Sequence, residues 1–348
     1  MFGDNYKTSK MKNSILAYCL LLAVFSSCSN KSLTFPDYKY TTVYFAYQSP
    51  VRTLDLGDDI FDNSLDNAHK CTIEATMGGV YKNTADISIS VSVDTTLCNN
   101  LLFSDGGSPV IPMPAGYYTL PKDMTIHIPS GSVEGGLEVQ LTDAFFADPR
   151  SITNTFVIPL RMTSVKNADS ILVGKSDLSS PDPRVVGDWT TPPKNYILYA
   201  IKYINPWHGN YLRRGTEQIH DNGGDTTIVY HTPFVETDQV VSTGTVSLST
   251  DSLLLDGKSR TNVDIPFQLL LTFDNNGKCT IANPPSAAYT LTGSGEFVKG
   301  GDSWGNQPRD VLHLKYTVNF GTDTHTFTDT LVVRDRGIKF ETFAPVVQ

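Results

Sequence analysis

Ile87-Ser88-Ile89-Ser90-Val91-Ser92-Val93 is the stretch of sequence that decides the fold. Apolar and polar side chains alternate along it, which is the period of a β-strand with one buried and one solvated face. The same alternation runs through Leu312-His313-Leu314-Lys315-Tyr316-Thr317-Val318-Asn319-Phe320 near the C-terminus. Residues 40–175 contain no amphipathic helical pattern of convincing length, so an all-β protein is expected.

The composition narrows the classes of function. The chain has 348 residues, of which 40% are hydrophobic and 18% charged, and its formal net charge is -9. A chain of this length can bury a sizeable core, so it needs neither disulfides nor a structural metal to fold. Nucleic acid is excluded as a partner, because nucleic-acid affinity depends on Lys and Arg side chains that neutralise the phosphates.

An export signal is expected at the N-terminus. The apolar run of residues 15–25 follows Met11 and Lys12 and is shorter than the about 20 residues that span a membrane. We therefore predict a signal peptide over residues 1–27, with Met11 as the true start. Phe25-Ser26-Ser27-Cys28 resembles a bacterial lipobox, in which the cysteine is acylated, so residues 28–40 would form a lipidated tether. The expected location is the outer membrane, on its surface or periplasmic face, with the lipid as the only membrane contact.

Two β-domains are expected beyond the tether. In residues 41–175, short strands separated by turn signals predict a β-sandwich. Residues 176–194 are rich in Ser and Pro and read as a linker. In residues 195–348, six or more strands are joined by tight turns such as Asp274-Asn275-Asn276-Gly277. They predict an antiparallel meander that closes into a barrel or half-barrel and so hides its edges.

Two finer expectations concern the first domain. Met124–Ile128 and Leu137–Leu141 both alternate and are separated by Pro129-Ser130-Gly131, which predicts a hairpin-like pair. Pro159 lies inside the strand pattern of Phe156–Val165. Because proline cannot donate to a ladder, this strand is expected at an edge or with a bulge.

The cysteines do not indicate a metal centre. Once Cys28 carries lipid, Cys71, Cys98 and Cys279 remain, and none of them lies in a C-x-x-C spacing. Cys71 and Cys98 would form a disulfide if their strands were neighbours. Buried, reduced cysteines are the simpler interpretation and the favoured one.

A family resemblance rests on several short motifs in a fixed order. Arg52-Thr53-Leu54-Asp55-Leu56-Gly57, Tyr118-Thr119-Leu120-Pro121 and Ile128-Pro129-Ser130-Gly131 resemble the Ig-like N-terminal domain, DUF1735, of Bacteroidetes polysaccharide-utilisation lipoproteins. Lys202-Tyr203-Ile204-Asn205-Pro206-Trp207-His208-Gly209-Asn210-Tyr211, followed by Arg213-Arg214-Gly215, is similar to the lipocalin-like C-terminal domain DUF4361. The resemblance implies an Ig-like sandwich, a lipocalin-like barrel and glycan handling beside an outer-membrane glycan importer.

A catalytic set cannot be assembled from the sequence. The part after the linker has about 160 residues, too few for a (β/α)8 barrel of about 250 residues. Gly293-Ser294-Gly295 lacks the strand-elbow-helix setting of a nucleophilic serine. The histidines do not fall at the spacing of metal ligands on a helix. We therefore expect no enzymatic activity, no metal and no cofactor.

Glycan recognition needs flat aromatic surfaces together with polar groups for the sugar hydroxyls. All three tryptophans lie in polar, turn-like segments, where aromatic side chains are often exposed. Trp207 also has a structural alternative, as the plug of the barrel floor. The predicted ligand-binding residues are Trp304, Asn306, Gln307, Arg309, Trp207, Tyr211 and Trp189.

The sequence thus predicts a non-catalytic envelope lipoprotein that binds oligo- or polysaccharide for a polysaccharide-uptake system. The alternative is a structural or adhesin-like envelope protein whose β-domains bind protein partners.

Overall fold

The structure is a computed structural model that describes residues 40–348. These residues form one compact unit, Tyr40–Gln348. The expected signal peptide, Cys28 and all but the last residue of the tether lie outside the described residues. Within residues 40–348, no helix has the length and apolar character to cross a membrane.

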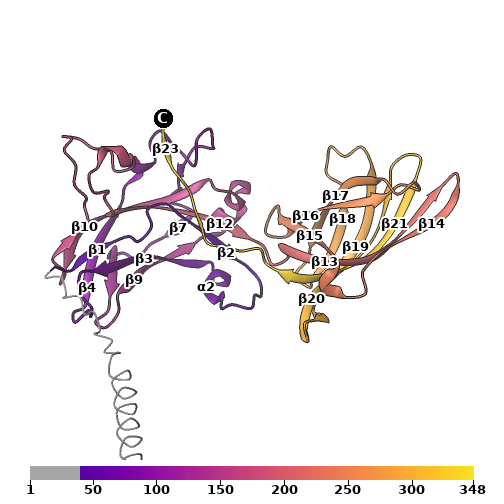
Figure 1. Ribbon diagram of the computed structural model, residues 1–348, viewed down its shortest axis with the longest axis horizontal. Helices are drawn as coiled ribbons and strands as arrows, with labels where there is room; N and C mark the ends of the chain where they lie inside the picture. The colour runs from indigo at the N-terminus through magenta and orange to yellow at the C-terminus, as the bar shows by residue number, and fades with distance from the viewer. Residues whose placement is uncertain (1–39) are drawn as a thin grey trace, which may run out of the picture. The chain divides into compact units, whose positions relative to one another are not determined.

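Two β-sheets packed face to face form the N-terminal lobe, called the sandwich below (Figure 1). The first has the order β11 (Ser170–Ile171), β1 (Thr42–Tyr44), β3 (Lys70–Gly78), β9 (Glu134–Leu141), β7 (Tyr118–Thr119). The second has the order β22 (Glu341–Thr342), β2 (Pro50–Asp55), β12 (Tyr196–Ile204), β10 (Phe156–Lys166), β4 (Ile87–Val93), β8 (Thr125–Ile128), with β6 (Ile111–Pro112) beside β10. A small third sheet pairs β5 (Leu101–Leu102) with β23 (Val346–Val347). Short helical segments are α2 (Ser64–Asn67), α3 (Asp143–Ala147), η1 (Thr95–Cys98), η2 (Pro149–Ile152) and η3 (Val186–Asp188). The expected Ig-like sandwich is confirmed.

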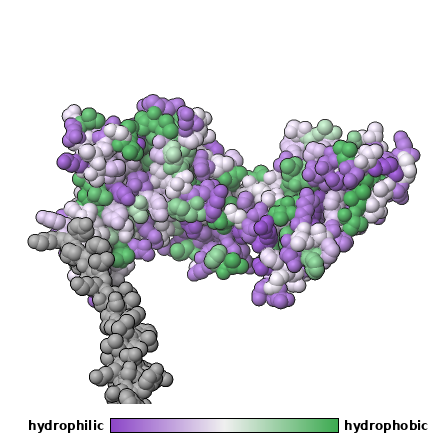
Figure 2. All heavy atoms as spheres, in the orientation of Figure 1, coloured by the Kyte–Doolittle hydropathy of each residue, from purple (hydrophilic) through white to green (hydrophobic). Residues whose placement is uncertain are grey.

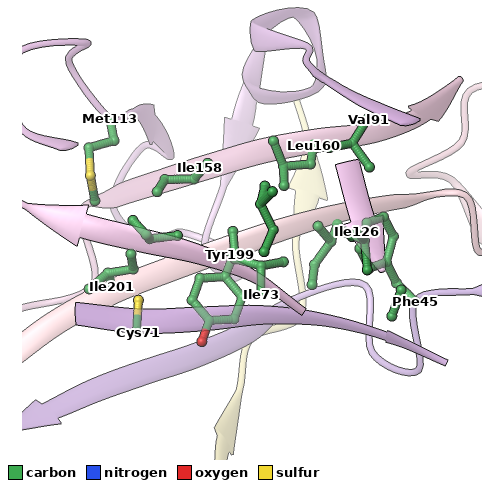
Figure 3. Close-up of a cluster of buried hydrophobic side chains, with 14 of the residues drawn as sticks. Phe45, Cys71, Ile73, Val91, Met113, Ile126, Ile158, Leu160, Tyr199 and Ile201 are labelled. Atoms are coloured by element: carbon green, nitrogen blue, oxygen red, sulfur yellow. The ribbon is translucent and has the colours of Figure 1, made fainter. Parts of the chain in front are cut away.

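The sandwich core lies between the two main sheets (Figure 3). β4 buries Ile87, Ile89 and Val91 while Ser88 and Ser90 between them stay partly exposed, as the alternation predicts; Val93 at the end of the strand departs from it and is 39% exposed. From the other sheet, Ile73 packs into the same cluster as Tyr199 of β12. The Tyr199 hydroxyl donates to the backbone oxygen of Thr72 at 3.1 Å. Each fully buried isoleucine contributes about 1.5–3 kcal/mol, so this alternation holds the sheets together.

The three cysteines of the described chain are free and buried, which confirms the favoured interpretation. They are Cys71, Cys98 and Cys279. Burial raises the pKa of each thiol to about 12. None is therefore ionised near neutral pH, and none is a ready nucleophile.

The expected hairpin of residues 124–141 is wrong. β8 pairs with β4 in the second sheet, whereas β9 pairs with β3 and β7 in the first. Both strands still alternate, because each buries one face in the same core. Alternation identifies a strand with one buried face but does not identify its partner, so the chain crosses between sheets at Pro129-Ser130-Gly131.

Pro159 lies in an interior strand, so the expectation of an edge strand is also wrong. β10 pairs with β12 on one side and with β4 on the other. The backbone oxygen of Pro159 accepts a hydrogen bond from Asp94 N at 2.9 Å, and the ladder with β4 begins only at Leu160. The nitrogen of Pro159 faces the β4 side of β10, at a point beyond the end of β4. The ladder therefore needs no N–H donor at this position. β10 does carry a register shift, but at Met162/Ser164.

β12 belongs to the sandwich, which corrects the expected start of the second domain at residue 195. It pairs antiparallel with β10 and parallel with β2. Residues 176–194, the expected linker, instead form a loop of the sandwich. Within it, the Arg184 guanidinium donates to the backbone oxygen of Asn99 at 2.6 Å. The chain leaves the sandwich only after Ile204.

Eight antiparallel strands form a closed C-terminal barrel, which confirms the expected meander. Their order is β13-β15-β16-β17-β18-β19-β20-β21, and β13 closes the barrel by pairing with β21. Closure joins the first and last strands of the meander, while β14 extends the second half of β13 and lies at the end of the sheet order. The strands are β13 (Gly209–Asp221), β14 (Gly224–Tyr230), β15 (Gln239–Thr245), β16 (Thr250–Lys258), β17 (Asp264–Phe273), β18 (Lys278–Ala282), β19 (Thr290–Trp304), β20 (Gln307–Asn319) and β21 (Thr324–Asp335), with η4 (Val235–Thr237) before β15.

Charged and aromatic side chains occupy one half of the barrel interior. Arg213 is fully buried, and its Nε lies 3.0 Å from Asp329 Oδ1. Its guanidinium lies 4.0 Å from the ring centroid of Tyr230. The Tyr230 hydroxyl donates to Glu217, which also contacts His325 Nδ1 at 2.5 Å. An eight-stranded barrel is just wide enough for its side chains to fill it.

The chain returns to the sandwich after the barrel, through β22 on β2 and β23 on β5 (Figure 1, yellow). Arg336 lies at the start of this return. Its guanidinium donates to the backbone oxygens of Leu56 at 3.1 Å and Asn205 at 2.7 Å. It also forms an ion pair of 2.9 Å with Asp55. This one buried guanidinium therefore connects the end of β2, the segment that leaves the sandwich after β12 and the segment that returns to it after β21.

Candidate functional site

The segment between β12 and β13 places Trp207 at one end of the barrel. Buried Asn205 organises this segment, because its side-chain oxygen accepts from the backbone nitrogens of Trp207 and His208, both at 3.1 Å. Its side-chain nitrogen donates to the backbone oxygen of Ser247 at 2.9 Å. The Trp207 oxygen accepts from the Tyr211 hydroxyl at 2.7 Å. The segment is thus held in place without regular secondary structure.

One face of the Trp207 indole is covered by Phe273, the last residue of β17. The ring centroids are 4.1 Å apart and the planes 6° from parallel. The indole is only partly buried and lines a cavity of about 510 Å³. Small-molecule sites have volumes of about 300–1,000 Å³, so this cavity is large enough for a ligand.

The turn between β17 and β18 brings polar groups to this cavity. Asn275 and Asn276 line it, are exposed, and use their side-chain amides in no hydrogen bond within residues 40–348. Gly277 permits the turn, because its φ is 79° and an added Cβ would lie 2.8 Å from the Phe297 oxygen. A primary amide both donates and accepts, which suits the hydroxyl groups of a polar ligand.

An exposed ion pair lies at the rim of the cavity. Lys299 Nζ is 2.5 Å from Asp58 Oδ2, and these side chains are 69% and 64% exposed. Asp310 lines the same cavity and accepts from the backbone nitrogen of Gly300 at 2.8 Å. Exposed ion pairs contribute about 0–1 kcal/mol to stability. The contact between Asp58 and Lys299 can therefore be replaced by contacts of each side chain with a ligand at little cost in free energy.

A buried carboxyl and a partly buried imidazole support the Trp207 segment. The fully buried Asp251 carboxyl accepts from the Asn205 amide, and burial raises the pKa of Asp251 to about 7. The backbone nitrogen of Thr245 donates to His208 Nδ1 at 3.1 Å, and burial lowers the pKa of His208 to about 4. A ring nitrogen that accepts carries no proton, so His208 is neutral at pH 7.

A larger cleft of about 730 Å³ adjoins the Trp207 cavity. Its loop between β2 and α2 carries Ile60 and Phe61, which are 80% and 74% exposed. Figure 2 shows hydrophobic residues of this loop among hydrophilic ones on the drawn face. Phe340, 67% exposed, also lines the cleft. Exposed apolar side chains rimmed by polar groups mark binding surfaces. The residues that line both cavities are Asp58, Lys299, Asp310, Val333 and Arg336.

Four of the predicted ligand-binding residues lie on the hairpin of β19 and β20. Trp304 is partly exposed, and its Nε1 donates to the backbone oxygen of Val333 at 3.1 Å. The Arg309 guanidinium lies 4.3 Å from the indole centroid and lines the larger cleft. Asn306 and Gln307 line a separate open hollow at the hairpin tip.

The remaining predicted residues fall in two places. Trp207 and Tyr211 line the same cavity, but Tyr211 is 1% exposed and supports the indole segment through its hydroxyl. Trp189 is partly exposed in the sandwich, where its Nε1 donates to the backbone oxygen of Asp182 at 2.7 Å. The structure therefore brings Trp207 and Tyr211 together, with Arg309 on the adjoining cleft, and leaves Trp189 apart.

Several lining residues were not identified from the sequence. The sequence pattern places Asn275 and Asn276 only in a turn, and it does not single out Phe61, Lys299 or Phe340. One signal was available for Phe61, which follows Ile60 within the acidic run Asp58-Asp59-Ile60-Phe61-Asp62. An apolar pair with no strand or helix period to bury it is a candidate for exposure.

Comparisons with known proteins cover most of the chain. Residues 206–337 match the family described as a domain of unknown function, DUF5627, and residues 38–169 match one described as an N-terminal domain. A crystal structure of a Bacteroides ovatus protein of unknown function is 44% identical, with a TM-score of 0.83 over 90% of this chain and 100% of that one. No curated protein matches the chain.

Two further structures are more distant. Another Bacteroides ovatus protein of unknown function is 15% identical, with a TM-score of 0.42 over 88% of this chain and 99% of that one. An auxiliary nutrient binding protein from Bacteroides thetaiotaomicron is 14% identical, with a TM-score of 0.39 over 81% of this chain and 90% of that one. Likenesses this weak carry no argument about function. The expected Bacteroidetes context is confirmed, but the C-terminal match is to DUF5627, and neither DUF1735 nor DUF4361 is named.

Proposed function

The chain belongs to the same family as the Bacteroides ovatus protein to which it is 44% identical, and from this premise we propose that it is a non-catalytic envelope lipoprotein that binds glycans for polysaccharide uptake. The ligand is an oligo- or polysaccharide. The anchor is the acylated Cys28, and the partner at the outer membrane is a glycan importer.

The observation that carries the proposal is the Trp207 cavity. The indole stacks on Phe273, and the side-chain amides of Asn275 and Asn276, which form no hydrogen bond among residues 40–348, line the same space. A pyranose ring has an apolar C–H face bordered by hydroxyls, so it needs a flat aromatic surface with donors and acceptors beside it. The cavity supplies both.

The acidic groups favour binding over glycoside cleavage. A glycosidase needs one protonated carboxyl at the scissile bond. Within residues 40–348, the carboxyls whose pKa is raised to about 7 are Asp55 and Asp251, at 4% and 0% exposure. Asp55 lines the larger cleft but is paired with Arg336, and Asp251 is paired with Asn205, so at these exposures neither carboxyl is presented to a sugar.

Affinity electrophoresis tests the proposal. The parent protein, Trp207→Ala and Phe234→Ala are run through native gels that contain galactomannan, xyloglucan, arabinogalactan or yeast mannan. Phe234 is 63% exposed and lines neither cavity, which makes it a matched aromatic control. We expect at least one polysaccharide to retard the parent and Phe234→Ala but not Trp207→Ala. Failure of every polysaccharide to retard the parent would refute glycan binding.

The exposed side chains of Ile60 and Phe61 favour a second candidate, a protein-binding envelope component. An affinity pull-down from envelope extracts separates the two. A protein partner captured by the parent and lost in Phe61→Ala, without retention by any glycan, would favour this alternative.

A further inference from the structure

The Trp207 cavity and the larger cleft share one ion pair in their lining. Both spaces are lined by Asp58 and Lys299, whose side chains come from the β2–α2 loop and from β19. Asp310 also lines both spaces. The pair is exposed and therefore weak, so a ligand that offers hydroxyl groups to both partners can extend from one space into the other.

The larger cleft has aromatic side chains of its own. Phe61 and Phe340 line it and are 74% and 67% exposed. Phe340 also contacts the ring of Tyr47, with centroids 4.9 Å apart. Arg309 lines the same cleft with its guanidinium over Trp304, and its Nε has no hydrogen-bond partner in the described structure. Both spaces therefore offer ring faces together with donors that have no hydrogen-bond partner among residues 40–348.

The charge of the Trp207 cavity limits the kind of sugar that fits. Its lining carboxylates are Asp58, Asp274 and Asp310, and its lining cations are Lys299 and Arg336. Arg336 is already committed to Asp55 and to backbone oxygens. Without Arg336, the three carboxylates outweigh Lys299 and the net charge of the cavity lining is negative. A carboxylate or sulfate group on the sugar would therefore be repelled.

We propose that the ligand is an uncharged oligosaccharide long enough to occupy both spaces, with one unit on Trp207 and another against Phe61 and Phe340. This inference rests on the proposed glycan binding and deepens it, because it specifies the charge and the extended form of the ligand. The chain runs past the Asp58–Lys299 pair, and its hydroxyl groups replace or share the contacts of that pair.

Isothermal titration with oligosaccharides of increasing length tests the inference. The probes are size-separated fragments of whichever of galactomannan, xyloglucan, arabinogalactan or yeast mannan retards the parent. We expect affinity to rise with length and then level off. We expect Phe61→Ala/Phe340→Ala to weaken the long fragments by about tenfold, equivalent to about 1.4 kcal/mol, while the disaccharide is unaffected. Phe234→Ala serves as the control, and thermal unfolding confirms that each variant is folded.

Each failure has its own meaning. If the disaccharide binds as tightly as the longest fragment, or if the double variant binds like Phe234→Ala, the extended ligand is refuted while glycan binding stands. Retention in a gel of polygalacturonan equal to that in the neutral gels would refute the uncharged ligand. If no polysaccharide retards the parent, the proposed function and this inference both fail.

Discussion

The indole of Trp207 lies face to face with the ring of Phe273, with centroids 4.1 Å apart and planes 6° from parallel. Because Phe273 covers one face, only the opposite face is open to a ligand, and the stack fixes its direction. Trp207 thus combines the two roles considered from sequence. It packs against the barrel core and it lines a cavity.

Ligand binding at this stack should change tryptophan fluorescence. The chain has three tryptophans, and only Trp207 lines either of the two adjoining cavities. We expect the retained polysaccharide to alter the emission of the parent, of Trp189→Phe and of Trp304→Phe, but not of Trp207→Phe. Steady-state titration measures this change. A change that persists in Trp207→Phe and disappears in Trp304→Phe would move the site to the β19–β20 hairpin.

Arg336 should be among the most important side chains for stability. It is 8% exposed, and its loss removes both the ion pair with Asp55 and the donors to the backbone oxygens of Leu56 and Asn205. Removing one partner of a buried ion pair costs about 3–5 kcal/mol, so we expect Arg336→Ala to lower the free energy of unfolding by that amount in urea denaturation. The control is Arg334→Ala, because Arg334 is exposed and lies 3.6 Å from its neighbour Asp335. Equal effects of the two substitutions would show that Arg336 does not hold the segments together.

Asp251 should make stability depend on pH with a defined sign. Its pKa is about 7 in the folded protein against 3.8 for an unperturbed side chain. The folded state binds the proton of the Asp251 carboxyl more tightly than the unfolded state does. The stabilisation that this proton gives the folded state is therefore complete below about pH 4 and is lost as the pH rises through about 7. Asp251→Asn removes this contribution. We expect the unfolding free energy of the parent, relative to the variant, to fall from about pH 4 to about pH 7 and then to level off. A pH-independent difference would contradict the raised pKa.

The thiols should be unreactive in the folded protein. Cys71, Cys98 and Cys279 are buried and free, and burial raises the pKa of each to about 12. In a form of the protein that begins at Ser29, we expect Ellman's reagent to detect no thiol in buffer and all three in guanidinium chloride. Detection of a single thiol after denaturation would instead indicate that two of the three cysteines form a disulfide.

The strand pattern was predictable from sequence because burial on one face imposes a period of two. Ile87 and Ile89 of β4 and Leu312 and Leu314 of β20 are buried as that period requires. Pairing between distant strands was not predictable. The parallel contact of β12 with β2 places Tyr203 opposite Leu54, and no local pattern records such a contact. The domain boundary near residue 195 failed for this reason.

The candidate site was only partly predictable. Trp207 was identified because a turn-like segment exposes aromatic side chains. Its cavity also depends on Asn276 of one turn, Lys299 of β19 and Asp58 of the sandwich, which come together only through the tertiary fold. Trp304 was predicted by the same reasoning as Trp207, yet its indole packs against the barrel exterior and carries Arg309 on its ring.

A crystal structure of the protein with a fragment of the retained polysaccharide tests the central claim most directly. We predict a sugar ring stacked on the Trp207 face opposite Phe273, with hydroxyls within hydrogen-bond distance of Asn275 or Asn276. A sugar ring bound elsewhere, with the Trp207 cavity empty, would contradict the account.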